Sequence, residues 1–147
     1  MTSSECHAKL NELLIRLNRS LLQYVGESWP WTDAESQATL SELDGLVKRQ
    51  QNDVARLVQV LLSHRWAIDF SNYPTEFTDK QFLSLNFLLP QIVAAEKVNT
   101  SICDETRACC GGDEQIAELL KQITANEADG VERLEKLLKT RKASAAA

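Results

Sequence analysis

The sequence predicts an all-α protein that folds as an antiparallel four-helix bundle. The 147 residues include only five Gly and three Pro, few for a fold of many strands and turns. Four long segments repeat apolar residues every three or four positions, which places them on one helix face. Short joints link the segments into two pairs, and one long connection separates the pairs. We expect a single domain over residues 1–142 and a disordered tail over 143–147.

The first helix is predicted over residues 4–25, before the helix-stopping Gly26 and Pro30. Its apolar stripe is spaced by alternating steps of four and three and consists of Leu10, Leu14, Leu17, Leu21 and Tyr24. The second helix is predicted to begin at a capping box formed by Thr32 and Glu35 and to end near Arg65.

The third helix is predicted to begin at a cap on Thr78 or Asp79 and to end near Cys110. Two glycines at 111–112 then stop it, and the fourth helix is predicted to begin at Asp113 and to have its last turn within residues 136–142. Because this joint is so short, the third and fourth helices should form an antiparallel hairpin.

The connection between the second and third helices covers residues 66–77. A dozen extended residues span roughly 40 Å. A helix as long as the second one measures roughly 48 Å. The connection can therefore return along the bundle, which would make the third helix parallel to the second.

Three polar residues lie near the midpoints of three predicted helices, each on the interior face: Gln50, Glu96 and Glu127. If they share one interior layer, they should hydrogen-bond to one another, with help from Asn99, and fix the register of the helices. Two neighbouring carboxylates in such a layer should share a proton. A lone metal ion or a small polar ligand in this layer is the alternative interpretation.

The helix lengths, the long crossover and the mid-helix polar positions together resemble the ferritin-like superfamily. In its di-iron members, Glu residues from four helices and two His residues hold the metals at this level. The resemblance matches Glu96 to the lone Glu of the third helix, and Glu127 and Gln50 to the Glu of the two Glu-x-x-His motifs. The other ligand positions depart from the pattern, since they hold Asp53, Gly130 and Leu17.

Two carboxylates and one amide are too few to balance the charge of two irons. The sequence therefore favours a ferritin-like bundle with a degenerate metal site, which acts without a cofactor as a non-catalytic binding or scaffold protein. The alternative is a metal-binding protein of the di-iron oxidase or iron-storage type with a rearranged ligand set.

In the crossover topology, both His and all four Cys gather at one end of the bundle: Cys6, His7, His64, Cys103, Cys109 and Cys110. Such nitrogen and sulfur ligands suit zinc, and the thiols could serve redox chemistry. Their spacing matches no Cys-x-x-Cys pair, however. The other interpretation is that the four Cys are reduced thiols without a shared role and that the two His are solvated helix-end residues.

The remaining predictions concern partners and location. A net charge of -5 argues against nucleic-acid binding, and no segment is apolar enough to span a membrane. Residues 1–10 lack the features of a secretory signal, so we expect a cytoplasmic protein. Trp29 and Trp31 at the first hairpin tip either cap the bundle or form an interface, and a homodimer is the expected oligomer.

Overall fold

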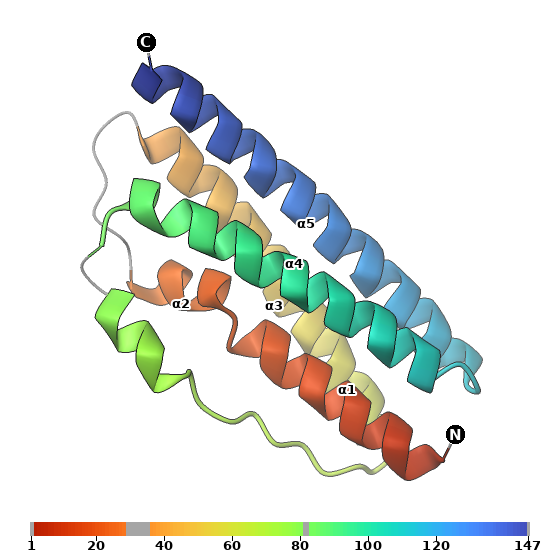
Figure 1. Cartoon of the computed structure of the whole chain (residues 1–147). Coiled ribbons are helices and arrows are strands. Elements are labelled where there is room, and N and C mark those ends of the chain that lie inside the picture. The colour runs from red at the N-terminus through yellow and green to blue at the C-terminus, as the bar shows by residue number, and fades with distance from the viewer. Residues whose placement is uncertain (1, 29–35, 81–82, 147) are drawn as a thin grey trace.

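The computed structural model describes residues 2–28, 36–80 and 83–146 (Figure 1). The described residues are helical apart from turns and one extended connection, and they contain no β-strand, which confirms the all-α prediction. The elements are α1 (Ser3–Asn18), α2 (Leu21–Ser28), α3 (Gln37–Ser63), the 3-10 helix η2 (Thr75–Lys80), α4 (Leu85–Cys109) and α5 (Glu114–Ala146).

The long helices lie side by side, as Figure 1 shows. The consecutive helices α1 and α2 contact both α3 and α4, and α5 also contacts α3 and α4. This pairing places α1 and α2 opposite α5, with α3 and α4 between them.

Two apolar clusters fill the interior, one toward each end. The first joins α1, the second half of α3, the end of α4 and the start of α5. The second joins α2, the first half of α3, the start of α4 and the second half of α5. Both α3 and α4 run from the second cluster to the first, so these two helices are parallel to each other.

The connection after α3 lies along α1 and α2. Its backbone carbonyl groups are contacted in order by the side chains of His7, Asn11 and Arg19 of α1 and the turn that follows it. Farther along, the Tyr73 hydroxyl donates a hydrogen bond to Glu27 at the end of α2. The connection therefore extends from the start of α1 to the end of α2 before α4 begins (Figure 1).

The first predicted helix is broken in two, which corrects the prediction of one helix over residues 4–25. The helix ends at Asn18, and Ser20 restarts it because its hydroxyl oxygen accepts the backbone N–H of Gln23 at 3.2 Å. The apolar stripe continues across this break, since Leu17 and Leu21 are both buried. Hydrophobic spacing alone therefore does not reveal the break.

The prediction for the start of the third helix was also wrong. Thr78 and Asp79 lie in η2, where the Thr78 hydroxyl donates to the Thr75 carbonyl group. The cap of α4 is Ser84, whose side chain accepts the backbone N–H of Phe87 at 3.3 Å. The capping box predicted at Thr32 and Glu35 lies outside the described residues.

The C-terminal segment also departs from the prediction. Helix α5 begins at Glu114, next to the predicted Asp113, but continues to Ala146 instead of ending before residue 143. Residues 143–146 of the expected tail are therefore helical. The composition of the segment explains the difference, because Ala has the highest intrinsic helix propensity.

Candidate functional site

A buried polar layer separates the two apolar clusters. It contains the three residues that the sequence predicts to meet, Gln50 of α3, Glu96 of α4 and Glu127 of α5. Two further residues join them from the α1–α2 break, Ser20 and Gln23. We call these five residues the mid-layer network.

The amide of Gln50 is the centre of this network. Its Nε2 donates to Glu96 Oε2 and to Glu127 Oε1, each at 3.1 Å. Its Oε1 accepts hydrogen bonds from Ser20 Oγ at 2.7 Å and from Gln23 Nε2 at 3.0 Å. A side-chain amide has two donor hydrogens and two acceptor positions, so all four are used. The Gln50 amide is therefore fixed with its nitrogen toward the two carboxyl groups.

The two carboxyl groups share a proton. Burial, followed by the charge of Glu96 and the hydrogen bond with it, raises the pKa of Glu127 to about 9. Glu127 is then neutral near pH 7 and donates to the Glu96 carboxylate. The layer consequently holds one negative charge on this pair instead of two.

A third buried acid lies beside the network. Asp53 follows Gln50 on α3, has no exposed surface, and accepts two hydrogen bonds from the Asn126 amide at 3.1 and 3.2 Å. Burial raises its pKa to about 6 and outweighs the opposing effect of the Asn126 hydrogen bond. Asp53 occupies the first of the two expected His positions, but it bonds to Asn126 and not to the network.

The second expected His position holds Gly130, and Arg49 fills the adjacent space. A β-carbon at Gly130 would lie 3.5 Å from Arg49 Nη2. The guanidinium group donates to Asp129 Oδ2 and to the Asn126 carbonyl oxygen, each at 2.8 Å. A cation thus lies where the ferritin-like pattern has a metal ligand.

The residues present do not fit a di-iron centre. The Gln50 N–H groups point at the two carboxyl groups, so donor hydrogens occupy the position that a cation would need. The cavity beside them is about 10 Å³, which holds one water molecule at most. In residues 2–28, 36–80 and 83–146 no three His, Cys, Asp or Glu side chains are grouped to hold a metal ion. Asn99 is buried, but no hydrogen bond to the network is found for it among the described residues.

Sequence reasoning missed Ser20 and Gln23 of the network and predicted Leu17 at this level of the first helix. Leu17 belongs to the first apolar cluster. The missed signal is the Ser-x-x-Gln pattern over residues 20–23, which is the pattern of a capping box and so marks a helix start.

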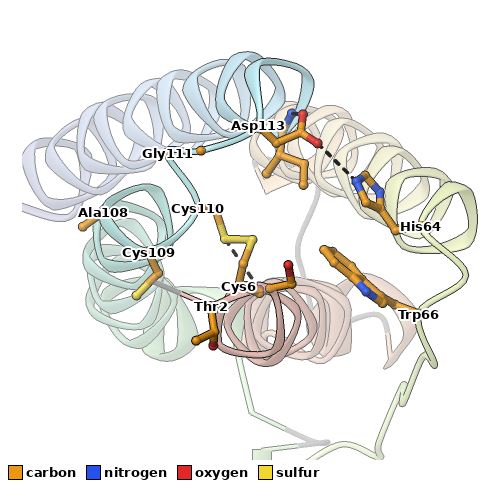
Figure 2. Close-up of a pocket in the computed structure, with 12 residues that line it drawn as sticks. Thr2, Cys6, His64, Trp66, Ala108, Cys109, Cys110, Gly111 and Asp113 are labelled. Carbon is orange, nitrogen blue, oxygen red and sulfur yellow. Dashed lines mark hydrogen bonds and ion pairs between the residues drawn. A yellow bond between two sulfur atoms is a disulfide. The ribbon is translucent and has the colours of Figure 1, made fainter.

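A larger cavity lies at the end of the molecule where α1 starts and α4 ends. Its volume is about 530 Å³, within the range of small-molecule sites. Figure 2 shows Trp66, His64 and a disulfide between Cys6 and Cys110 around its opening. We call this the end pocket. The disulfide corrects the expectation that all four Cys are reduced.

The geometric reason for the disulfide is that the first turns of α1 meet the end of α4. The Cα atoms of Cys6 and Cys110 are 5.1 Å apart, which is within the range that a disulfide can bridge. The other two cysteines are free: Cys103 is buried, and burial raises the pKa of its thiol to about 12, while Cys109 is partly exposed beside Cys110.

The two histidines are partly exposed, as expected of helix-end residues, and His64 is the C-cap of α3, but both also stack on Trp66. Their rings stack on the indole with centroid separations of 5.2 Å for His7 and 4.5 Å for His64. His64 also contacts the Val60 carbonyl oxygen at 3.0 Å and Asp113 Oδ2 at 3.2 Å. The Val60 contact, followed by Asp113, raises the pKa of His64, and the Ile116 N–H group, followed by His64, lowers the pKa of Asp113.

The six predicted soft ligands therefore do not assemble into a zinc site. Two of the thiols form the disulfide, His7 and His64 stack on the indole of Trp66, and among the described residues no three possible ligands are grouped to hold a metal ion. The predicted interface residues Trp29 and Trp31 lie outside the described residues. Among the described helices, none is long and apolar enough to cross a membrane.

Comparison with known proteins finds no matching family model, no matching curated protein and no matching solved structure. The functional interpretation consequently depends on the residues of the mid-layer network and the end pocket.

Proposed function

We propose that this protein is a ferritin-like four-helix bundle that has lost the di-iron site and acts as a non-catalytic binding or scaffold protein. The direction of α3 and α4 and the position of the connection support the ferritin-like topology. The observation that carries the functional proposal is the Gln50 amide, which donates to both Glu96 and Glu127 where the family places its metals.

In this proposal, the mid-layer network is a structural device. A buried polar layer whose hydrogen-bonding groups are all paired favours one helix register over its neighbours, because any shift would leave those groups unpaired. The fixed register in turn holds the end pocket and the outer helix faces in one arrangement for binding. We further propose a cytoplasmic homodimer, the commonest oligomer of soluble proteins.

Iron binding tests the proposal. The purified protein is incubated with Fe²⁺ in air, bound iron is quantified after gel filtration, and the appearance of Fe³⁺ is followed by absorbance. We expect no stoichiometric iron and no oxidation faster than in buffer. Two bound iron equivalents that are lost in Glu96→Gln would contradict the proposal and favour a di-iron oxidase or storage protein with a rearranged ligand set.

Two variants isolate the role of the amide. Gln50→Glu replaces the two donor hydrogens by a third carboxylate and should create measurable binding of a divalent metal ion. Gln59→Glu, the same change at an exposed position of α3 away from the network, should not. Light scattering gives the oligomeric state, and a monomer at all concentrations would exclude the scaffold dimer.

A further inference from the structure

The Cys6–Cys110 disulfide lies at the edge of the first apolar cluster, where that cluster meets a cavity. Both cysteines line the end pocket, whose volume of about 530 Å³ accommodates a small organic molecule. Figure 2 shows the two sulfur atoms between the start of α1 and the α4–α5 turn, with Trp66 directed toward the same opening. A molecule in this pocket would lie against the disulfide, and the small exposed part of Cys6 is its point of access.

The pocket also has open space beside the disulfide for the rest of a bound molecule. Gly111 and Gly112 form one side, and a β-carbon at either position would meet no atom within 4 Å. Thr2 and Ser3 supply hydroxyl groups, and Asp113 supplies a carboxylate paired with His64. The lining is thus more polar than an apolar ligand site would be.

Cleavage of the disulfide would produce a thiol at Cys110, and the structure offers this thiol a hydrogen-bond acceptor. Cys110 Sγ lies 3.5 Å from the carbonyl oxygen of Cys6, so a Cys110 thiol has a hydrogen-bond acceptor within reach without rearrangement. Cys6 is the more exposed partner, with 9% of its surface accessible against 3% for Cys110. Attack at Cys6, with Cys110 as the leaving thiol, fits both observations.

We propose that the Cys6–Cys110 disulfide is a thiol–disulfide exchange site for a low-molecular-weight thiol that binds in the end pocket. The ligand thiolate attacks Cys6 Sγ, a ligand–Cys6 disulfide forms, the Cys6–Cys110 bond breaks, and Cys110 leaves as a thiolate that takes up a proton. A second thiolate then attacks the ligand sulfur and releases the oxidised thiol dimer and the Cys6 thiol. Two thiols are oxidised as one protein disulfide is reduced.

This activity goes beyond the proposed binding or scaffold role, since it uses none of the mid-layer residues. The two remaining cysteines do not substitute for the pair. Cys103 is fully buried, and the pKa of its thiol, raised by burial, keeps it protonated. Cys109 is partly exposed and could exchange secondarily, so Cys109→Ser is the appropriate background for the test.

The test uses the full chain with Cys109→Ser and reduced glutathione as the probe. Samples are quenched with acid, and intact and digested protein is measured by mass spectrometry. We expect one glutathione on Cys6, with a rate that saturates as the glutathione concentration rises. We also expect this rate to exceed the rate of global unfolding measured in parallel. Cleavage that occurs only as fast as unfolding, or glutathione on Cys110 alone, would overturn the proposal.

A second pair of variants tests the pocket without removing a cysteine. Gly111→Phe fills the open space and should slow the glutathione reaction at least tenfold while the disulfide remains formed. Gly45→Phe, which also meets no neighbouring atom but lies on α3 away from the pocket, should leave the rate unchanged. Equal rates in both variants would show that the disulfide reacts without a bound thiol.

Discussion

At the scale of single residues, one shared proton determines how the mid-layer network responds to pH. The pKa of Glu127 is raised from its ordinary value of 4.5 to about 9, so the native protein holds a proton there that the unfolded chain releases between these values. A group with a raised native pKa stabilises the fold most at low pH. Asp53, whose pKa is raised to about 6, acts in the same direction below that pH.

We therefore expect the free energy of unfolding to fall as the pH rises from about 5 to about 9. In Glu127→Gln this fall should be much smaller, because the amide can still donate to Glu96 but does not titrate. Urea unfolding followed by circular dichroism over this pH range measures both slopes. Glu132→Gln, an exposed change on the same helix, should keep the wild-type slope. A wild-type stability that is constant or rises with pH would contradict the shared proton.

The centre of this network could be predicted from the sequence, because Gln50, Glu96 and Glu127 interrupt apolar helix faces at the midpoints of their helices. The contacts of the residues around the network could not be predicted. Arg49 is close to Asp129 and Asn126 only because α3 and α5 are adjacent, and no local pattern in the sequence reports this contact. The interior faces of helices are therefore easier to predict than the contacts at their edges.

At the scale of secondary-structure elements, the break between α1 and α2 joins helix capping to the network. The Ser20 hydroxyl accepts the Gln23 N–H group that starts α2 and also donates to Gln50 at 2.7 Å. Loss of a helix cap costs about 1 kcal/mol. Gln50 Oε1 would keep its hydrogen bond from Gln23 and lose the one from Ser20, and the loss of one hydrogen bond costs about 0.5–1.5 kcal/mol more.

Ser20→Ala should therefore lower the free energy of unfolding by about 1.5–2.5 kcal/mol. Ser101→Ala is the matched control, since Ser101 is exposed on α4 and its hydroxyl only contacts the carbonyl group of its own preceding turn. Chemical denaturation of both variants gives the comparison. If the two changes cost the same, the break is not stabilised by Ser20.

The element boundaries also show where sequence reasoning fails. Thr78, Asp79 and Ser84 are all acceptable helix caps by residue type. Ser84 is the cap because α4 begins where Leu85 enters the second apolar cluster, and this depends on tertiary packing. The Cys6–Cys110 disulfide could not be predicted for the same reason. The two cysteines are 104 residues apart and meet only once the connection is in place.

At the scale of the whole molecule, the connection between α3 and η2 has little slack. Ala67 contacts His7, and Tyr73 contacts Glu27. The chain from Ala67 to Tyr73 spans about 20 Å when extended. His7 and Glu27 are separated by about 30 Å along the helices they belong to, so the side chains of Tyr73 and Glu27 must bridge the remainder.

Deletion of Ser71 and Asn72 should consequently prevent the connection from reaching the start of α4. We expect the free energy of unfolding to fall by about 3 kcal/mol or more, because the hydrogen bonds from His7, Asn11 and Arg19 can no longer all form. Replacement of the same two residues by Gly-Gly keeps the length and is the matched control. It should cost less than about 1 kcal/mol, because Ser71 has a φ of 54°, a conformation that Gly adopts without strain. Denaturant unfolding, with hydrogen exchange of the first turns of α4, distinguishes the two. If the deletion is tolerated as well as the replacement, the length of the connection does not determine the parallel arrangement of α3 and α4.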